Sequence, residues 1–205
     1  DGDSVGSVCA LRFYLETLRV PTAIFCPTPI QQNLAFLPGA DEIKNDPALL
    51  AHSAVDTIIV CDAGDLRYAG LAETLTTMAK RPTIINIDHH ASNENFGDFN
   101  LVNPSAAATT EVIYAFFKTI NFPLTEDIAT CLLTGLITDT DHFSNAATTA
   151  TAMAMASDLI ARGARLHVIR QNTLNNKPVA LLKLWGIALA RLYYQPRHDS
   201  VVTYL

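Results

Sequence analysis

Two short apolar segments rich in β-branched residues constrain the fold more than any other feature of the sequence. Residues 55–61 read VDTIIVC and residues 83–87 read TIINI, and both runs are nearly continuously apolar instead of alternating with polar residues. Strands of this kind are covered on both faces, as in a parallel sheet with helices on each side. Because a helical segment is expected over residues 65–80, the pattern predicts an α/β fold with a parallel β-sheet flanked by helices.

The rest of the pattern predicts helices around this sheet. The spacing of Val8, Leu11, Leu15 and Leu18 predicts an opening helix. Prolines bound a short strand expected at 20–26, and an irregular segment with a turn at Pro38 follows over 31–45. Further along, we expect helices at 105–120 (capped by Ser105), 124–137, 148–162, 168–174 and 179–192, a turn at 195–199, and a strand from 200 to 205.

The composition indicates a folded protein and argues against a disordered or membrane-spanning chain. With 205 residues, 49% of them hydrophobic, the chain can bury a sizeable core and is too apolar for disorder. Its apolar runs stay below about 18 residues, so no membrane association is expected for this part of the chain. It also shows no signal segment, and its four cysteines are not in metal-binding spacings. We therefore expect a cytoplasmic location with buried free thiols.

The net charge of −6 argues against a broad nucleic-acid surface. Proteins that follow a duplex are usually basic, so no tracking along duplex DNA is expected. A small phosphate ester bound through metal ions remains compatible with an acidic chain, because the ions supply the positive charge locally.

Acidic residues stand where the parallel strands are expected to end. Asp62 follows the first strand, Asp88-His89-His90 follow the second, and Asp1 and Asp3 directly precede a helix. Residues 135–143 add further carboxylates. Ligands of open α/β sheets bind at this edge, and carboxylates packed together repel one another unless cations neutralise them. Carboxylates with imidazoles suit manganese or magnesium, and two such ions about 3.5–4 Å apart can clamp a phosphoryl group.

Four segments in order resemble the motifs of the DHH phosphoesterase superfamily. They are residues 1–7 (DGDSVGS), Asp62 after a strand, Asp88-His89-His90, and residues 135–143 (GLITDTDHF). Within the superfamily, the sequence is most similar to the nanoRNase/pAp phosphatase (NrnA-type, RecJ-like) group over about residues 1–195. The resemblance implies hydrolysis of phosphate esters with two Mn²⁺ ions, Mg²⁺ or Co²⁺ being the alternatives.

The resemblance also implies a role for individual residues. His90 would be catalytic through contact with the scissile phosphate, and Asp62 would be catalytic as the ligand that bridges both ions. Asp88 would orient or support a ligand without contacting an ion itself. We expect Asn103 and Asn145 to contact the substrate. The implied metal ligands are Asp1 at the first ion, Asp3, His89 and Asp139 at the second, and Asp62 at both.

The chain departs from the family pattern in three places. The family carries a further metal-binding histidine, on a strand, shortly before the residue that corresponds to Asp1, and it commonly has glycine where this chain has Asp141. The glycine-rich motif of the smaller second domain is also missing. We therefore predict a DHH catalytic domain over 1–178 that lacks its first strand. Residues 179–205 would be a linker helix and the start of the absent substrate-binding domain.

Several residues have simpler interpretations. Asp1 and Asp3 are also typical of a helix N-cap, and capping is the preferred interpretation of Asp65. The segment 103–105 precedes a helix, so it suits capping as well as substrate contact. Residues 141–142 fit a solvated loop at the rim of the site.

The leading hypothesis is a manganese-dependent phosphoesterase. Its substrates would be short oligonucleotides and/or 3′-phosphoadenosine 5′-phosphate (pAp), small nucleotide phosphates that need no basic track. The alternatives are a linear or cyclic dinucleotide phosphodiesterase or single-strand exonuclease of the same superfamily, and a non-catalytic nucleotide-binding DHH domain. A homodimer is a further expectation.

Overall fold

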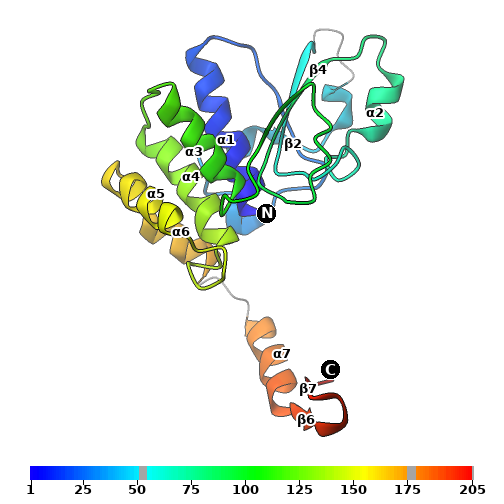
Figure 1. Cartoon of the computed structure of the whole chain (residues 1–205), viewed down its shortest axis with the longest axis vertical. Helices are drawn as coiled ribbons and strands as arrows, with labels where there is room; N and C mark the ends of the chain where they lie inside the picture. The colour runs from blue at the N-terminus through cyan, green and yellow to red at the C-terminus, as the bar shows by residue number, and fades with distance from the viewer. Residues whose placement is uncertain (51–54, 175–178, 205) are drawn as a thin grey trace.

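The protein combines a parallel sheet with a layer of helices (Figure 1). The computed structural model describes residues 1–50, 55–174 and 179–204. The expected α/β class is confirmed, because parallel strands and helices alternate along the first part of the chain and the helices then pack on the sheet.

The main sheet has the order β3-β4-β5, formed by β3 (Thr57–Cys61), β4 (Thr83–Asp88) and β5 (Phe99–Val102). Both neighbouring pairs are parallel, with Ile58 opposite Ile84 and Ile87 opposite Leu101. The two strands expected from the β-branched runs are confirmed. Strand β5 was not expected, because its residues are mostly exposed and show no apolar run.

A second, smaller parallel pair joins β1 (Ile24–Phe25) to β2 (Ile43–Lys44). The strand expected at 20–26 is therefore shorter than predicted. The segment 31–45, predicted as irregular, contains β2, which is too short for its sequence to reveal. The expected turn at Pro38 is present, since Gly39 has a φ of 82°. The 3-10 helices of this region are Gln32–Leu34, Ala40–Glu42 and Pro47–Leu49.

The helical layer centres on α4 (Glu126–Asp139), whose residues from Ile128 to Ile137 are all buried. Helix α1 (Gly2–Thr17) packs against α4, and glycines at the contact allow the two backbones to approach closely. A Cβ on Gly6 would lie 2.5 Å from the carbonyl oxygen of Cys131, and one on Gly2 would lie 2.5 Å from Thr138 Oγ1. This close approach sets the start of α1 beside the end of α4. The layer is completed by α3 (Thr109–Thr119), α5 (Ala150–Ala161) and α6 (Leu166–Thr173).

The cysteines lie inside this framework as free thiols. Cys9 on α1 and Cys131 on α4 are buried, as expected, whereas Cys26 and Cys61 are half-buried at the ends of their strands. The expectation that all of them are buried therefore holds for the helical pair only.

Two helix predictions need correction, the first at both ends and the second at its start. Helix α2 covers Ala72–Thr77 instead of 65–80, because Asp65 accepts the backbone N–H groups of Arg67 and Tyr68 and so stabilises a separate turn. Helix α3 begins at Thr109, after an N-cap at Ala108. The prediction that Ser105 caps this helix is therefore wrong.

The C-terminal segment comprises α7 (Val179–Ala190) and an antiparallel hairpin of β6 (Tyr193–Gln195) and β7 (Ser200–Val202). The expected helix and the strand from 200 are present, and the turn contains the 3-10 helix Pro196–His198. Strand β6 was not predicted. The boundary predicted at 178/179 falls beside 175–178, outside the described residues. None of the helices in the described part of the chain is long and apolar enough to cross a membrane.

Candidate metal centre

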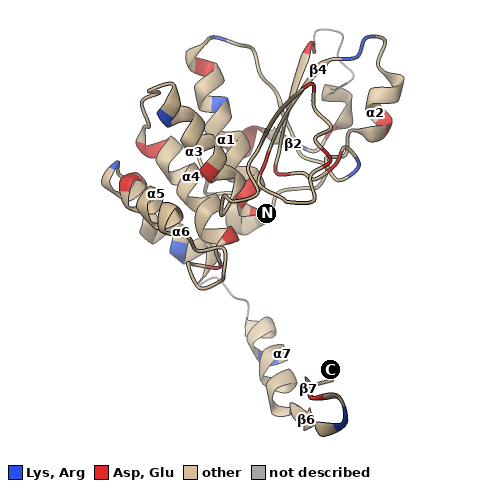
Figure 2. Ribbon diagram, viewed as in Figure 1, with Lys and Arg blue, Asp and Glu red and all other residues tan. Residues whose placement is uncertain are grey.

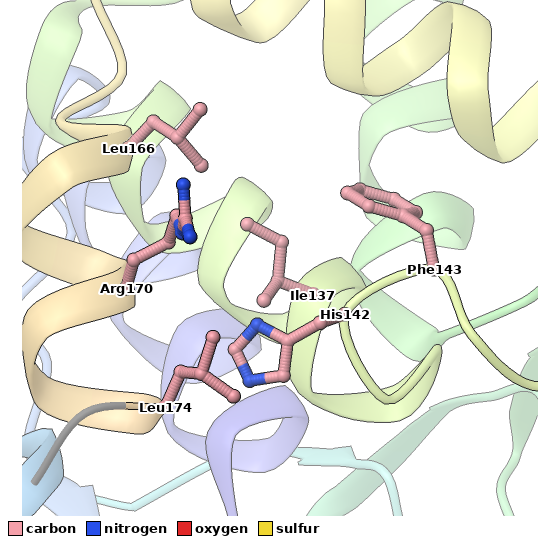
Figure 3. Close-up of a pocket in the computed structure, with 6 residues that line it drawn as sticks. All are labelled: Ile137, His142, Phe143, Leu166, Arg170 and Leu174. Atoms are coloured by element: carbon pink, nitrogen blue, oxygen red, sulfur yellow. The ribbon is translucent and has the colours of Figure 1, made fainter.

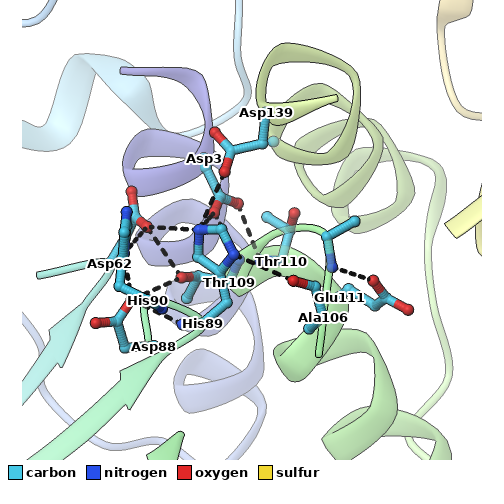
Figure 4. Close-up of polar contacts among 12 residues, drawn as sticks. Asp3, Asp62, Asp88, His89, His90, Ala106, Thr109, Thr110, Glu111 and Asp139 are labelled. Atoms are coloured by element: carbon cyan, nitrogen blue, oxygen red, sulfur yellow. Dashed lines mark hydrogen bonds and ion pairs between the residues drawn. The ribbon is translucent and has the colours of Figure 1, made fainter. Parts of the chain in front are cut away.

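Carboxylates and two histidines from separate elements meet where the strands of the main sheet end (Figure 4). Asp62 follows β3, Asp88 ends β4, and His89 comes next. Asp3 reaches the same place from the first turn of α1, and Asp139 from the last residue of α4. Figure 2 shows acidic residues gathered around the N-terminal end of α1. The side chains that were predicted to converge at this edge of the sheet lie together there.

Asp3 is fully buried and is held by the N-terminus of α3. Its Oδ2 accepts the backbone N–H of Thr109 at 2.6 Å, and its Oδ1 accepts that of Thr110 at 2.9 Å. The N-cap of α3 is Ala108, whose side chain offers no acceptor. Asp3 thus caps α3 from another helix, where the positive end of the helix dipole favours a carboxylate.

Burial makes the negative charge of Asp3 costly. It raises the pKa of this carboxyl from 3.8 to about 8, and repulsion from Asp62 and Asp139 acts in the same direction. The two amides of α3 oppose the rise in pKa without cancelling it. A site that contained only protein would therefore keep Asp3 protonated near neutral pH, whereas a bound cation would stabilise the carboxylate.

Asp62 is buried, and its backbone is left-handed with a φ of 60°. Thr109 Oγ1 donates to its Oδ1 at 3.0 Å. Ser4 Oγ lies 2.6 Å from its Oδ2 and 3.1 Å from Asp1 Oδ1. Because a hydroxyl has one proton, the shorter distance favours donation to Asp62. A left-handed backbone is uncommon for a non-glycine residue and is typical of functional sites.

Asp88 holds the turn that carries both histidines. Its Oδ1 accepts the backbone N–H groups of His89 at 2.7 Å and His90 at 3.2 Å, and lies 2.8 Å from His90 Nδ1. Its Oδ2 accepts Asn93 Nδ2 at 2.6 Å. Burial by itself would raise the pKa of Asp88, but hydrogen bonds from Asn93 and His90 hold it below the usual value. The carboxylate is therefore ionised and fixed.

His89 presents a nitrogen to the other carboxylates. Its Nδ1 lies 3.2 Å from the carbonyl oxygen of Ala106, which fixes the ring. Its Nε2 lies 3.1 Å from Asp139 Oδ2, 3.9 Å from Asp62 Oδ1 and 4.0 Å from Asp3 Oδ2. This buried nitrogen makes no hydrogen bond of good geometry, and the Asp139 carboxylate is its ion-pair partner. Burial would lower the pKa of His89, but Asp139 and Asp3 raise it to about 9.

These residues fit a divalent cation. One group contains Asp3, His89 and Asp139, and a second contains Asp62, Asp88, His89 and His90. In each group the candidate ligand atoms lie within 4.8 Å of one another. A buried imidazole nitrogen without a hydrogen bond of good geometry, aimed among carboxylates, is the arrangement that an ion would complete. The oxygen-rich donor set suits manganese or magnesium better than structural zinc.

Three residues proposed from sequence lie outside both groups. Asp1 is exposed and caps α1 by accepting the N–H groups of Asp3 and Ser4, both at 3.1 Å, as its simpler interpretation stated. Asn103 Oδ1 accepts the N–H of Ser105, and Asn145 Nδ2 donates to the carbonyl oxygen of Asp139 at 2.8 Å. The asparagines thus support loops beside the site. The metal role of Asp1 and the substrate roles of Asn103 and Asn145 remain predictions.

Sequence reasoning missed the residues that hold the ligands in place. They are Ser4, Asn93, Thr109, Thr110 and Gly135. A Cβ on Gly135 would lie 2.5 Å from Thr110 Cγ2 and 2.6 Å from Asp3 Oδ1, so only glycine leaves room for this contact. Its place in the motif 135–143 was a usable signal for Gly135. The two threonines offered none, because their contacts depend on the packing of α3 against α1.

The loop after Asp139 lines a cavity of about 340 Å³ (Figure 3). Asp141, His142 and Phe143 have φ values of 46°, 57° and 65°, and three consecutive left-handed residues are rare outside glycine. His142 is half-buried, so it is not the solvated loop residue of the simpler interpretation, whereas Asp141 is exposed. The cavity is lined by Ile137, His142, Phe143, Leu166, Arg170 and Leu174.

Comparison with known proteins gives the same family as the motifs. The model of the DHH family, N-terminal domain, matches residues 1–136. A Thermus thermophilus protein named bifunctional oligoribonuclease and PAP phosphatase NrnA is 29% identical over 194 residues, which cover 95% of this chain and 56% of that protein. The Bacillus subtilis protein of the same name is 28% identical over 169 residues, covering 78% and 49%. The chain spans about half the length of these curated relatives.

The fold has a close structural counterpart. The crystal structure of an exopolyphosphatase-related protein from Bacteroides fragilis superimposes with a TM-score of 0.88 at 22% identity, and the match covers all of this chain and 62% of that one. At this identity the likeness concerns the fold alone.

Proposed function

Because the chain belongs to the DHH family, we propose that it is the catalytic part of a metal-dependent phosphoesterase. Its substrates would be short oligonucleotides and pAp, and its cofactor two manganese ions. Support for the substrate class comes from the names of the relatives, which match 95% and 78% of the chain. The proposed assignment of residues 1–178 to this catalytic domain rests on the same family match and motifs.

One observation carries this proposal. The buried Nε2 of His89 makes no hydrogen bond of good geometry, although the carboxylates of Asp139 and Asp62 face it at 3.1 and 3.9 Å. A single imidazole nitrogen that faces several carboxylates supports a metal centre, because a cation can be bound by all of them at once. A metal centre at the strand ends of a DHH fold supports phosphate chemistry.

In the proposed function, the residues of the centre would have separate roles in binding the metal ions. Asp3, His89 and Asp139 would hold one ion, and Asp62 would contribute to both ions. The role of Asp1 at the other ion rests on the sequence motifs alone. When bound, such ions would neutralise the carboxylates, polarise an attacking water and stabilise the phosphate. Support for this role of Asp62 comes from Ser4 and Thr109, whose hydroxyls hold its Oδ2 and Oδ1 in place.

His90 would contact the scissile phosphate. Asp88 orients its ring through Nδ1, and its side chain remains 48% exposed at the rim of the site. In that place an imidazole can donate to a phosphate oxygen and stabilise the charge that develops there. The acidic composition of the chain supports small substrates, since longer strands need a basic track.

The proposal is tested by assaying the full-length protein that contains this chain with pAp, pApA, longer oligonucleotides and pyrophosphate in the presence of Mn²⁺. We expect hydrolysis of pAp and pApA, weak action on longer strands, and loss of activity with chelator. Asp62→Asn should lower kcat by at least about a hundredfold, because it removes the central charge of the site. Glu73→Gln, which changes an exposed acidic residue on α2, is the matched control.

Two results would contradict the proposal. One is metal-independent hydrolysis by the unmodified full-length protein. The other is an Asp62→Asn variant that keeps both full activity and the original metal content.

A further inference from the structure

The segment from Asn103 to Thr110 wraps around the candidate metal centre. The N–H of Asn103 donates to the carbonyl oxygen of Asp88 at 3.0 Å, and the carbonyl oxygen of Ala106 lies 3.2 Å from His89 Nδ1. Thr109 and Thr110 then hold Asp3 through their N–H groups. The segment thus contacts candidate ligands at the end of β4 and on α1 (Figure 4).

Within this segment, Thr109 contacts several carboxylates of the centre directly. It is fully buried, and its N–H donates to Asp3 Oδ2 at 2.6 Å. Its Oγ1 lies 3.0 Å from Asp62 Oδ1 and 3.5 Å from Asp88 Oδ1. One residue therefore contacts three carboxylates that come from α1, the end of β3 and the end of β4.

We propose that Thr109 is a positioning residue of the metal centre. Its amide holds Asp3 and its hydroxyl holds Asp62, so one ligand of each candidate group is fixed in place before any ion binds. The inference rests on the metal centre proposed above. Preorganisation of this kind matters because carboxylates that are not held in place repel one another and move apart. Bringing them together would then consume part of the free energy of metal binding.

The neighbouring Thr110 provides a matched control. It is also fully buried and also gives its N–H to Asp3, but its hydroxyl has no hydrogen-bond partner. Replacement of either threonine by valine removes a hydroxyl and keeps the shape and the backbone N–H. A difference between the two valine variants therefore reports the contacts of the Thr109 hydroxyl, not the packing at the start of α3.

The test is a titration of the 205-residue chain with Mn²⁺, followed by electron paramagnetic resonance, which also records the spectrum of the bound ion. We expect Thr109→Val to raise the Kd for Mn²⁺ by about 10- to 100-fold and to broaden the spectrum of the bound ion. Thr109→Ser should restore both, because it keeps the hydroxyl. Thr110→Val, which keeps the N–H that Asp3 accepts, should raise the Kd far less than Thr109→Val does.

Circular dichroism and thermal unfolding establish that each variant is folded. If Thr109→Val does not fold, Thr109→Ala replaces it, with Thr110→Ala as its control. The inference is overturned if the Thr109 variant binds Mn²⁺ as tightly and with the same spectrum as the unmodified chain. Equal losses in the Thr109 and Thr110 variants also overturn it.

The experiment separates this inference from the proposed function. If no phosphate ester is hydrolysed but Thr109→Val still weakens binding of Mn²⁺, the proposed function fails and the role of Thr109 stands. If the unmodified chain binds neither Mn²⁺ nor Mg²⁺, both fail.

Discussion

At the scale of single residues, two side chains of the centre, Asp3 and His89, have raised pKa values. Asp3 is buried among carboxylates, and the pKa of its side chain rises to about 8. His89 faces the same carboxylates, and its pKa rises to about 9. Without a cation, both groups therefore favour their protonated forms. A metal ion requires the opposite forms, because carboxylate oxygens and a neutral imidazole are its ligands.

The two raised pKa values predict how the stability of the metal-free protein depends on pH. Stability due to the raised pKa of Asp3 is present below 3.8 and is lost as the pH approaches about 8. The stability due to the raised pKa of His89 is present below pH 6.5 and is lost as the pH rises through about 9. The Tm of the chelated chain should therefore fall between about pH 6 and about pH 9, as followed by circular dichroism.

Added Mn²⁺ should reverse this dependence, so that the gain in Tm on adding the ion grows over the same range. Replacement of Asp3 by asparagine serves as the control, since it should flatten the pH dependence of the metal-free chain. A metal-free Tm that increases with pH would show that Asp3 and His89 do not titrate as the structure indicates.

At the scale of elements, glycines in α1 and α4 decide where the ligands meet. Gly6 and Gly2 let α1 approach α4, and Gly135 leaves space for the Asp3 carboxylate and for Thr110 at the start of α3. The three helices therefore meet at Asp3, which belongs to α1 and caps α3. Any increase in side-chain volume at this point moves a candidate metal ligand.

Gly135→Ala tests the close approach at Asp3. The added Cβ would lie 2.5 Å from Thr110 Cγ2 and 2.6 Å from Asp3 Oδ1, so the helices must separate. We expect a loss of about 1–3 kcal/mol in the free energy of unfolding, measured with urea, and a weaker affinity for Mn²⁺. Alanine normally stabilises a helix relative to glycine.

The control is Gly186→Ala on α7, where a Cβ meets no atom within 4 Å. It should leave stability unchanged or raise it slightly. A gain of stability in both variants would contradict the close approach of the helices at Asp3.

At the scale of the whole molecule, the proposed ions would connect parts of the chain that are distant in sequence. Asp3, Asp62, His89 and Asp139 lie on α1, after β3, after β4 and at the end of α4. An ion held by them would bind the folded chain and not the unfolded one. Its binding free energy would then add to the stability of the whole domain.

The expected size of this effect follows from linkage. Free Mn²⁺ at about one hundred times its Kd should stabilise the fold by about 2.7 kcal/mol. For a chain of this length, that corresponds to an increase in Tm of about 5–10 °C, measured by scanning calorimetry. Asp139→Asn should reduce the increase, whereas Asp199→Asn, in the C-terminal hairpin, should not. An equal shift in both variants would indicate binding elsewhere.

The fold class and the location of the centre could be predicted from the sequence. The β-branched runs identified β3 and β4, and local chemistry placed Asp62 and Asp88 at their ends. The order of the motifs gave the family that the comparison found over residues 1–136. These features depend on neighbours along the chain and on a general property of parallel sheets, so the sequence alone contains them.

Only the tertiary structure decided how Asp88-His89-His90 connects to the rest of the centre. The strand β5, the start of α3 at Thr109 and the space beside Gly135 all depend on contacts between segments far apart in sequence. Those contacts bring a helix N-terminus to Asp3, a hydroxyl to Asp62 and the Nε2 of His89 to Asp139. Local propensity carries no information about them, because each group is satisfied only by a partner that packing delivers.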